Sequence, residues 1–591
     1  MKGFFKMMFA SIFGVFIALF IAGLFSVLIL AGIIAGAGSQ TFLTKKNSVL
    51  EINLSGVMSD RVVENPLASL FGGNDVKQLS MIDIVSSIKK AKEDKNIKGI
   101  YLKGGLLVSG ISSVEAIRES LIDFKESEKF VVAYLEQCSQ SAYYLCSAAD
   151  KIIFNPLGML DLHGLAAVPV FYTGLLEKLG IKMEIFKVGT FKSAVEPFML
   201  NKMSNASREQ VKSYLGCLWN NISSNIAESR KLSREDLNKL VNEGLILKDA
   251  NYLLYAGLVD TVLYSTDASD YLKELVGIGK KEELNVASIS NMKPLPLKKN
   301  DVKDEIAVLF AEGEITKAPS GTFNTESVIS DKEFVKELKK LRDNDNVKAV
   351  VFRVNSPGGS MFIAEQIWKE VAEIKKVKPI VVSMGNYAAS GGYYISCAAD
   401  WIVAEPTTLT GSIGVFSMIP NAEGLMGKVG LTTDSEKTNK FADFGNLSRA
   451  LNVDEKTLLQ AYTVKAYDMF LTRCADGRPN KSKAAIDSIG QGRVWTGVQA
   501  LQLGLVDELG GLDKAIEVAA QRAGLEIYDT NHYPVQKDFF TLLLEESMGG
   551  VKMRLLKSLL SESEFRNYSL LKNVEQQDYI QARMPFDLEI K

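Results

Sequence analysis

The feature that most constrains the fold of this chain is an internal duplication. When the sequence is shifted by 250 positions, segments of its two halves align without gaps, so that Asn96–Ile100 meets Asn346–Val350. Near the end of each copy the shift becomes 247, where Gly257–Asp260 meets Gly504–Asp507. Matches that keep one register over about a hundred residues do not arise by chance, so the chain consists mainly of two copies of one unit.

Each copy alternates apolar strands with helices. In the second copy a helix over Phe334–Leu341 precedes a strand over Ala349–Val354, and a helix over Ala364–Ile374 precedes a strand over Ile380–Met384. Another short strand, Trp401–Ala404, follows. Strands that alternate with helices at this spacing form βαβ units and a mostly parallel sheet. The sequence therefore predicts an α/β protein with two tandem domains of the same fold.

An uncharged, apolar segment precedes the first copy. No charged residue lies between Lys6 and Lys45, and Met7–Gly38 is a run of 32 apolar and small residues. At about 1.5 Å per residue a helix of this length reaches ~48 Å, more than the ~30 Å hydrocarbon core. A cleavable signal peptide has an apolar region of only about 7–15 residues, although Ala35–Ala37 resembles a cleavage site. We expect an uncleaved transmembrane helix in the lipid bilayer at residues 7–38, whose orientation does not follow from the flanking charges.

These features divide the chain into five parts. The stretch Gly277–Asn300 is charged, carries two prolines and lacks periodicity, which is typical of a linker. From about Asp529 onward we find no counterpart in the first copy, and the mixture of apolar and charged residues suggests helices. The predicted parts are an anchor over residues 1–46, a first copy over 47–276, a linker over 277–304, a second copy over 305–528 and a C-terminal extension over 529–591.

The composition excludes several kinds of function. The formal net charge is -2, and without a basic excess we expect no nucleic acid partner. A Ser-His-Asp triad would have to use one of only two histidines, His163 and His532, and a His-rich metal site is nearly excluded. None of the five cysteines forms a CxxC pair, which indicates buried free thiols. We therefore expect no metal and no cofactor.

Two motifs in the second copy follow strands and suggest acyl-transfer chemistry. Asn355–Ser360 holds a Pro-Gly-Gly turn, which exposes backbone N–H groups at the crevice where open α/β sheets bind ligands. Paired N–H groups can stabilise an oxyanion. Ser390 lies between small residues at a strand-to-helix turn, where the helix dipole favours a developing negative charge. The first copy has Gln140 at the position of Ser390, and an amide cannot be a nucleophile.

The first copy carries a lysine that the second copy lacks. Lys192 lies among Phe191, Val195 and Phe198, and Ala442 stands at the corresponding position of the second copy. A lysine acts as a base only when it is neutral, so its pKa must fall from ~10.4 towards ~7, at a cost of roughly 4–5 kcal/mol. One copy thus offers a nucleophile without a base and the other a base without a nucleophile. This complementary loss suggests one composite site.

Ser412 is a third candidate. It lies in Thr410–Gly414, where its hydroxyl could orient the lysine amine, and the first copy has Leu162 instead. Each candidate also has a purely structural interpretation. Ser390 and Ser412 could be ordinary turn residues, Lys192 could be a surface lysine, and the Pro-Gly-Gly sequence could be a structural turn.

Four motifs together carry a family resemblance. Ser-Pro-Gly-Gly, Ala-Ser-Gly-Gly-Tyr-Tyr, Thr-Gly-Ser-Ile-Gly and Phe-Lys-Ser-Ala-Val-Glu-Pro-Phe resemble the long, tandem-domain form of bacterial signal peptide peptidase A, or protease IV. The resemblance implies a fold similar to the Clp protease and crotonase superfamily. It also implies that Ser390 is the nucleophile, Lys192 the general base and Ser412 a support for the lysine. The backbone N–H groups of Gly359 and Gly391 would form the oxyanion hole.

The resemblance further implies a serine endopeptidase that degrades cleaved signal peptides and other hydrophobic peptides. Members of this family are homotetramers held in the bacterial inner membrane by a single span, with catalytic domains facing the periplasm. Two other functions remain open from the residues alone. A crotonase-like acyl-CoA enzyme would use the same oxyanion hole but leave the serine surplus, and a catalytically silent membrane scaffold would not need a reactive serine.

Overall fold

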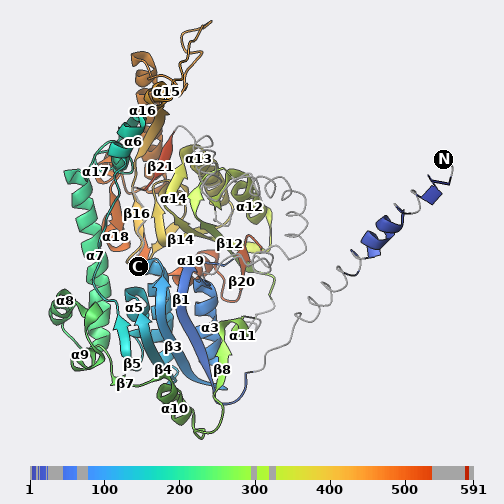
Figure 1. The fold of residues 1–591 in the computed structure, drawn as a ribbon, viewed down its shortest axis with the longest axis vertical. Coiled ribbons are helices and arrows are strands. Elements are labelled where there is room, and N and C mark those ends of the chain that lie inside the picture. The colour runs from blue at the N-terminus through green and yellow to red at the C-terminus, as the bar shows by residue number, and fades with distance from the viewer. Residues whose placement is uncertain are drawn as a thin grey trace.

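The computed structural model describes residues 44–62, 77–293, 302–317, 328–535 and 580–584, together with part of residues 3–25. In these ranges the chain forms three β-sheets with helices packed against them (Figure 1). The two larger sheets belong to the two copies, and their main strands are parallel. The predicted α/β architecture with tandem domains is therefore confirmed.

The sheet of the first copy has helices on both faces. One face packs against helices α3, α4 and α5, and α10 covers the other, where Val49, Tyr101 and Val132 contact Ala268 and Leu272 in one buried cluster. Burial on both faces explains the continuous apolar runs of the strands. The elements are β1 (Ser48–Ser59), β3 (Ile97–Val108), β4 (Phe130–Cys138), β5 (Lys151–Leu160), α3 (Met81–Glu93), α4 (Ile111–Lys125), α5 (Gln140–Cys146) and α10 (Ser265–Val276).

The second copy repeats this arrangement. The predicted strands over 349–354, 380–384 and 401–404 lie within β12, β14 and β15, and the predicted helices over 334–341 and 364–374 lie within α12 and α13. Helix α19 covers the outer face as α10 does in the first copy. The elements are β9 (Glu305–Glu312), β12 (Val347–Ser356), β14 (Ile380–Ala389), β15 (Trp401–Ala404), β16 (Leu409–Gly411), α12 (Asp331–Asp343), α13 (Met361–Ile374), α14 (Gly391–Ser396) and α19 (Leu512–Ala523).

The duplication extends further than the sequence showed. Strand β8 (Asn285–Ser288) runs parallel to the start of β1, and strand β20 (Asp529–Tyr533) runs parallel to β9 in the same way. Residues expected to be a linker thus form a strand, and the start of the C-terminal extension does have a counterpart in the first copy. The described residues of the extension form strands β20 and β21 (Gln581–Arg583), where we had expected helices. Strands as short as these leave little periodicity to detect.

A third sheet joins the copies. Strand β6 (Lys182–Val188) of the first copy pairs antiparallel with β17 (Val415–Asn421) of the second along its whole length. The strand order is β11-β10-β13-β21-β17-β6, in which β10 (Glu314–Ile315), β11 (Val328–Ile329) and β13 (Gly358–Ser360) come from the second copy. Helix α7 (Asn205–Arg230) runs along both copies (Figure 1). Because β6 belongs to this sheet, the segment that follows β6 in the sequence reaches the second copy.

Buried polar contacts also tie the two copies together. Arg353 on β12 donates from Nε to the Oδ2 of Asp60 at 2.8 Å, and both side chains are 1% exposed. Nearby, the Asn386 amide donates to the Ser113 hydroxyl at 2.8 Å. Because a buried charge needs its partner, this ion pair makes the packing of the two copies specific.

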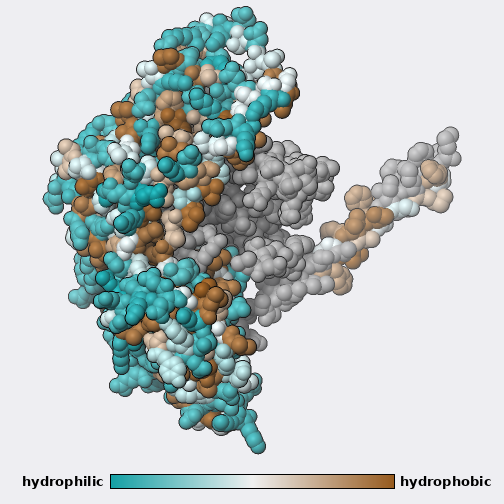
Figure 2. Space-filling model, turned by 60° about the vertical axis from the view of Figure 1, so that its left-hand side comes forward, coloured by the Kyte–Doolittle hydropathy of each residue, from teal (hydrophilic) through white to brown (hydrophobic). Residues whose placement is uncertain are grey.

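The predicted membrane segment at residues 7–38 lies largely outside the described residues. Within the described part of the chain, no helix combines the length and apolar character needed to cross a membrane. The described residues near the N-terminus include Phe13, Phe16 and Phe20, whose side chains are exposed. Figure 2 shows hydrophobic surface on the arm that extends from the body.

Candidate active site

Ser390 stands between β14 and α14 in a strained backbone conformation. Its φ is 56°, a region that residues with a side chain rarely adopt. The turn is held by the Ser390 N–H, which donates to the Gly411 carbonyl at 2.8 Å, and by the Tyr394 N–H, which donates to the Ser390 carbonyl at 2.8 Å. Strain of this kind concentrates at functional sites, where the surrounding structure fixes one geometry.

Lys192 of the first copy reaches Ser390 of the second. Its Nζ lies 2.8 Å from the Ser390 Oγ, although 198 positions separate them in the sequence. The same amine lies 3.2 Å from the Ser412 Oγ and 3.4 Å from the Ser412 carbonyl oxygen. The side chain is completely buried, and this burial lowers the pKa of the Lys192 ammonium well below its ordinary value. The three predicted side chains of the site therefore meet.

The Lys192 loop is held by residues that the sequence did not single out. Gln210 on α7 donates from Nε2 to the Phe191 carbonyl at 2.9 Å and to the Ser193 hydroxyl at 2.8 Å. Its Oε1 accepts from the Val494 N–H of the second copy at 3.2 Å. Gln210 could have been identified from the sequence, because a glutamine on the buried face of an amphipathic helix needs hydrogen-bond partners. Gln210 thus locks the lysine loop to both copies.

Gly492 lets the second copy approach this loop closely. A Cβ at Gly492, whose φ is 78°, would lie 2.6 Å from the Lys192 backbone nitrogen. The next residue, Arg493, accepts the Ser412 N–H at 2.7 Å through its carbonyl, and its guanidinium lies 4.6 Å from the ring centre of Phe191. One short segment therefore positions both Ser412 and the lysine loop.

The glycines predicted to form an oxyanion hole lie beside the serine. Gly358 and Gly359 have φ values of 102° and 150°, so both need glycine. A Cβ on Gly391 would lie 3.1 Å from the Gly359 nitrogen, which shows how closely these two backbone segments approach. Adjacent N–H groups next to a hydroxyl are the arrangement that stabilises the oxyanion of a tetrahedral intermediate.

The corresponding position of the first copy has a different task. The Oε1 of Gln140 accepts the N–H groups of His163 and Gly164 at 3.2 and 2.9 Å, and its Nε2 donates to the Gly164 carbonyl. His163 pairs with Asp161 at 2.6 Å in a setting where the histidine is half exposed. Gln140 thus closes a turn at the place where the second copy has its serine.

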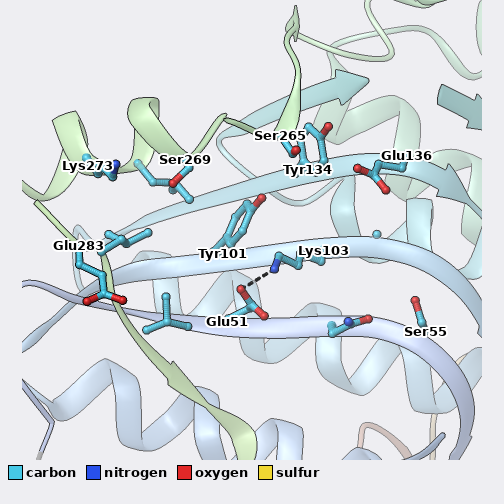
Figure 3. A pocket seen from close by; sticks show the side chains of 15 residues that line it. Glu51, Ser55, Tyr101, Lys103, Tyr134, Glu136, Ser265, Ser269, Lys273 and Glu283 are labelled. Atoms are coloured by element: carbon cyan, nitrogen blue, oxygen red, sulfur yellow. Dashed lines mark ion pairs between the residues drawn. The ribbon is translucent and has the colours of Figure 1, made fainter. Parts of the chain in front are cut away.

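A pocket of about 600 Å³ lies on the sheet of the first copy and has no part in this site. Figure 3 shows Glu51 and Lys103 paired on its floor, with Tyr101 and Tyr134 beside them. None of the five predicted site residues lines it. Among the described residues, no group of three His, Cys, Asp or Glu side chains could hold a metal ion.

The arrangement supports nucleophilic chemistry at Ser390. A neutral amine within hydrogen-bond distance of a hydroxyl can accept its proton as the oxygen attacks a carbonyl carbon. Burial lowers the pKa of the Lys192 ammonium and so favours the neutral form that this step requires. Ser412 provides a second oxygen that fixes the direction of the amine.

Comparison with known proteins identifies the family of this chain. The profile of Peptidase family S49 matches residues 123–279 and 372–526, one segment in each copy, and a Clp protease profile matches residues 304–404. The chain is 36% identical to Protease 4 of Salmonella typhi, over 89% of this chain and 86% of that one. It is 34% identical to Protease 4 of Haemophilus influenzae, over 90% of both.

A shorter relative matches only part of the chain. This protein of Enterococcus faecium, named for signal peptide peptidase SppA, is 33% identical over 40% of this chain and 72% of its own. The family profile covers more than half of the present sequence, and the two Protease 4 relatives match it almost from end to end. The chain therefore belongs to peptidase family S49, as a serine peptidase of the long, tandem-domain form.

Proposed function

We propose that this peptidase uses Ser390 as its nucleophile and Lys192 as its general base. The observation that carries the proposal is the 2.8 Å contact between the buried Lys192 amine and the Ser390 hydroxyl. Ser412 holds the amine in place, and the N–H groups of Gly359 and Gly391 stabilise the oxyanion of the tetrahedral intermediate. The site is composite, because each copy supplies one member of the dyad.

The substrates in this proposal are cleaved signal peptides and other hydrophobic peptides in extended conformation. The name of the Enterococcus faecium relative supports signal peptides as substrates. The uncharged run at residues 7–38 supports a single-span membrane anchor. The inner membrane, the periplasmic side of the catalytic domains and a homotetrameric assembly belong to the proposal through the family resemblance alone. An acyl-CoA enzyme or a silent scaffold would not need a lysine buried against a serine at this energetic cost.

A serine-reactive fluorophosphonate tests the proposed dyad. The full chain is labelled and digested, and the modified peptide is identified by mass spectrometry. We expect the label on Ser390, with labelling and peptide hydrolysis both lost in Ser390→Ala and both reduced at least ~100-fold in Lys192→Ala.

The matched control for the base is Lys178→Ala, which removes an exposed lysine on helix α6 (Thr173–Leu179) and should label like the parent chain. Label on another residue, or hydrolysis that persists in Ser390→Ala, would exclude Ser390 as the nucleophile.

A further inference from the structure

A short segment of the second copy, residues 490–493, supports both the lysine loop and the serine that holds its amine. The carbonyl of Gln491 accepts the N–H of Phe191, the residue directly before the lysine, at 2.8 Å. Two positions later the carbonyl of Arg493 accepts the Ser412 N–H at 2.7 Å. A displacement of this segment would therefore move the base and its support together.

The backbone of Gln491 is strained where it meets the lysine loop. Its φ is 52°, in the left-handed region that residues with a side chain rarely adopt. A Cβ on Gly189, at the start of the lysine loop, would lie 2.6 Å from the Gln491 carbonyl oxygen, so the two backbones are in close contact. A strained conformation persists only when the surrounding structure fixes it. Gln491 therefore depends on contacts outside the lysine loop.

Tyr467 on helix α16 (Val453–Gly477) provides such a contact. Its hydroxyl accepts the Gln491 N–H at 3.2 Å and donates to the Oδ1 of Asp487, on helix α17 (Lys483–Ile489), at 2.6 Å. The Gln491 side chain donates from Nε2 to the same carboxylate oxygen. Tyr467 is buried, and burial, with the hydrogen bond to Asp487 as the next cause, raises the pKa of its hydroxyl. The hydroxyl thus stays protonated and ties Gln491 to two helices.

From these contacts we infer that Tyr467 is a positioning residue, which holds the lysine base in place through residues 490–493. The inference rests on the proposed function of the dyad and extends it to a side chain that acts at one remove. The Tyr467 hydroxyl fixes Gln491, and the two carbonyls of the segment then fix the lysine loop and Ser412. A displacement of about 1 Å in a catalytic group can cost ~100-fold in rate, so this support matters for turnover.

Tyr467→Phe removes the hydroxyl and keeps the ring. We expect kcat to fall about 10-fold or more, while KM changes less than about 2-fold. The midpoint of the kcat/KM profile against pH should rise by about half a pH unit or more, because a looser loop lets water reach the amine and its pKa returns towards the ordinary value. Both are measured on the full chain. Tyr462→Phe removes an exposed hydroxyl from the same helix and should match the parent chain.

Two variants of Asp487 test the same link without changing the tyrosine. Asp487→Leu removes the oxygen that accepts the Tyr467 hydroxyl and should lower kcat and raise the pH midpoint as Tyr467→Phe does. Asp487→Asn keeps an acceptor oxygen and should stay within about threefold of the parent kcat. A lower thermal midpoint with the parent kcat and pH midpoint in both Tyr467→Phe and Asp487→Leu would overturn the inference, since a purely structural role changes only the amount of folded chain.

Lys192→Ala, measured beside these variants, separates the inference from the proposed function. If Lys192→Ala still hydrolyses peptide at the parent rate, the dyad is wrong and the positioning role is wrong with it. If Lys192→Ala is inactive while Tyr467→Phe keeps the kcat and pH midpoint of the parent chain, the dyad holds and only the role of Tyr467 is overturned.

Discussion

Lys192 is completely buried, and its amine makes hydrogen bonds to oxygen atoms of Ser390 and Ser412. Desolvation penalises the charged form of such an amine, so the neutral form is the one that the fold favours. The same physics explains why a lysine can do here what histidine does in other serine peptidases. Because the amine contacts Ser390, its neutral form is a base next to a hydroxyl.

The pH dependence of hydrolysis follows from this lowered pKa. The active form is neutral, so kcat/KM should rise with pH through the lowered pKa of Lys192 and level off above it. Initial rates between about pH 5 and pH 10, at constant ionic strength, measure the profile. Lys192→Arg should be inactive throughout, since a guanidinium stays protonated. A rate that falls between about pH 6 and pH 8 would argue against a lysine base.

At the scale of elements, the site depends on strands and helices that cross from one copy to the other. Strand β6 pairs with β17 and delivers the Lys192 loop, and α7 fixes that loop through Gln210. Ser390 and Ser412 come from the turns after β14 and β16, which are neighbouring strands of one sheet. Placing reactive groups on turns that rigid elements hold gives a geometry that a free loop could not keep.

Gln210→Glu tests this role of α7. The substitution keeps the shape of the side chain but removes the Nε2 donor to Phe191 and Ser193. We expect kcat to fall about 10-fold or more with a smaller change in KM, because the lysine loop loses its position while the substrate groove stays intact. Gln499→Glu is the matched control, since that glutamine donates to Ser213 on the same helix but away from the loop. If kcat falls equally in both variants, Gln210 has no special role in positioning the lysine loop.

At the scale of the whole molecule, the two copies work as one unit because their interface contains buried charge. Asp60 pairs with Arg353, and the Asp60 N–H also donates to Glu312 at 3.2 Å. Burial, with the charge of Asp60 as the next cause, raises the pKa of Glu312 to about 7. Removing Arg353 would leave the carboxylates of Asp60 and Glu312 facing each other across the junction without their buried ion-pair partner.

Arg353→Met should therefore destabilise the whole chain. Breaking a buried ion pair costs about 3–5 kcal/mol, which lowers the thermal midpoint by roughly 6 °C or more in a domain of this size. Differential scanning calorimetry measures the shift. Lys340→Met removes an exposed pair with Glu337 and should change stability by less than about 0.5 kcal/mol. Adding Asp60→Leu to Arg353→Met should recover most of the loss, and no recovery would mean that packing, not charge, holds the junction.

The sequence by itself determined the duplication, the alternation of strands and helices, the motifs that follow the strands and the complementary loss at Gln140 and Ala442. These are properties of local order and repetition, which a linear sequence displays directly. Only the tertiary structure decided that β6 crosses to β17 and that β8 and β20 are equivalent edge strands. It alone placed residues 580–584 beside Gly359. Such pairings join residues far apart through backbone hydrogen bonds, and these bonds leave almost no trace in side-chain chemistry.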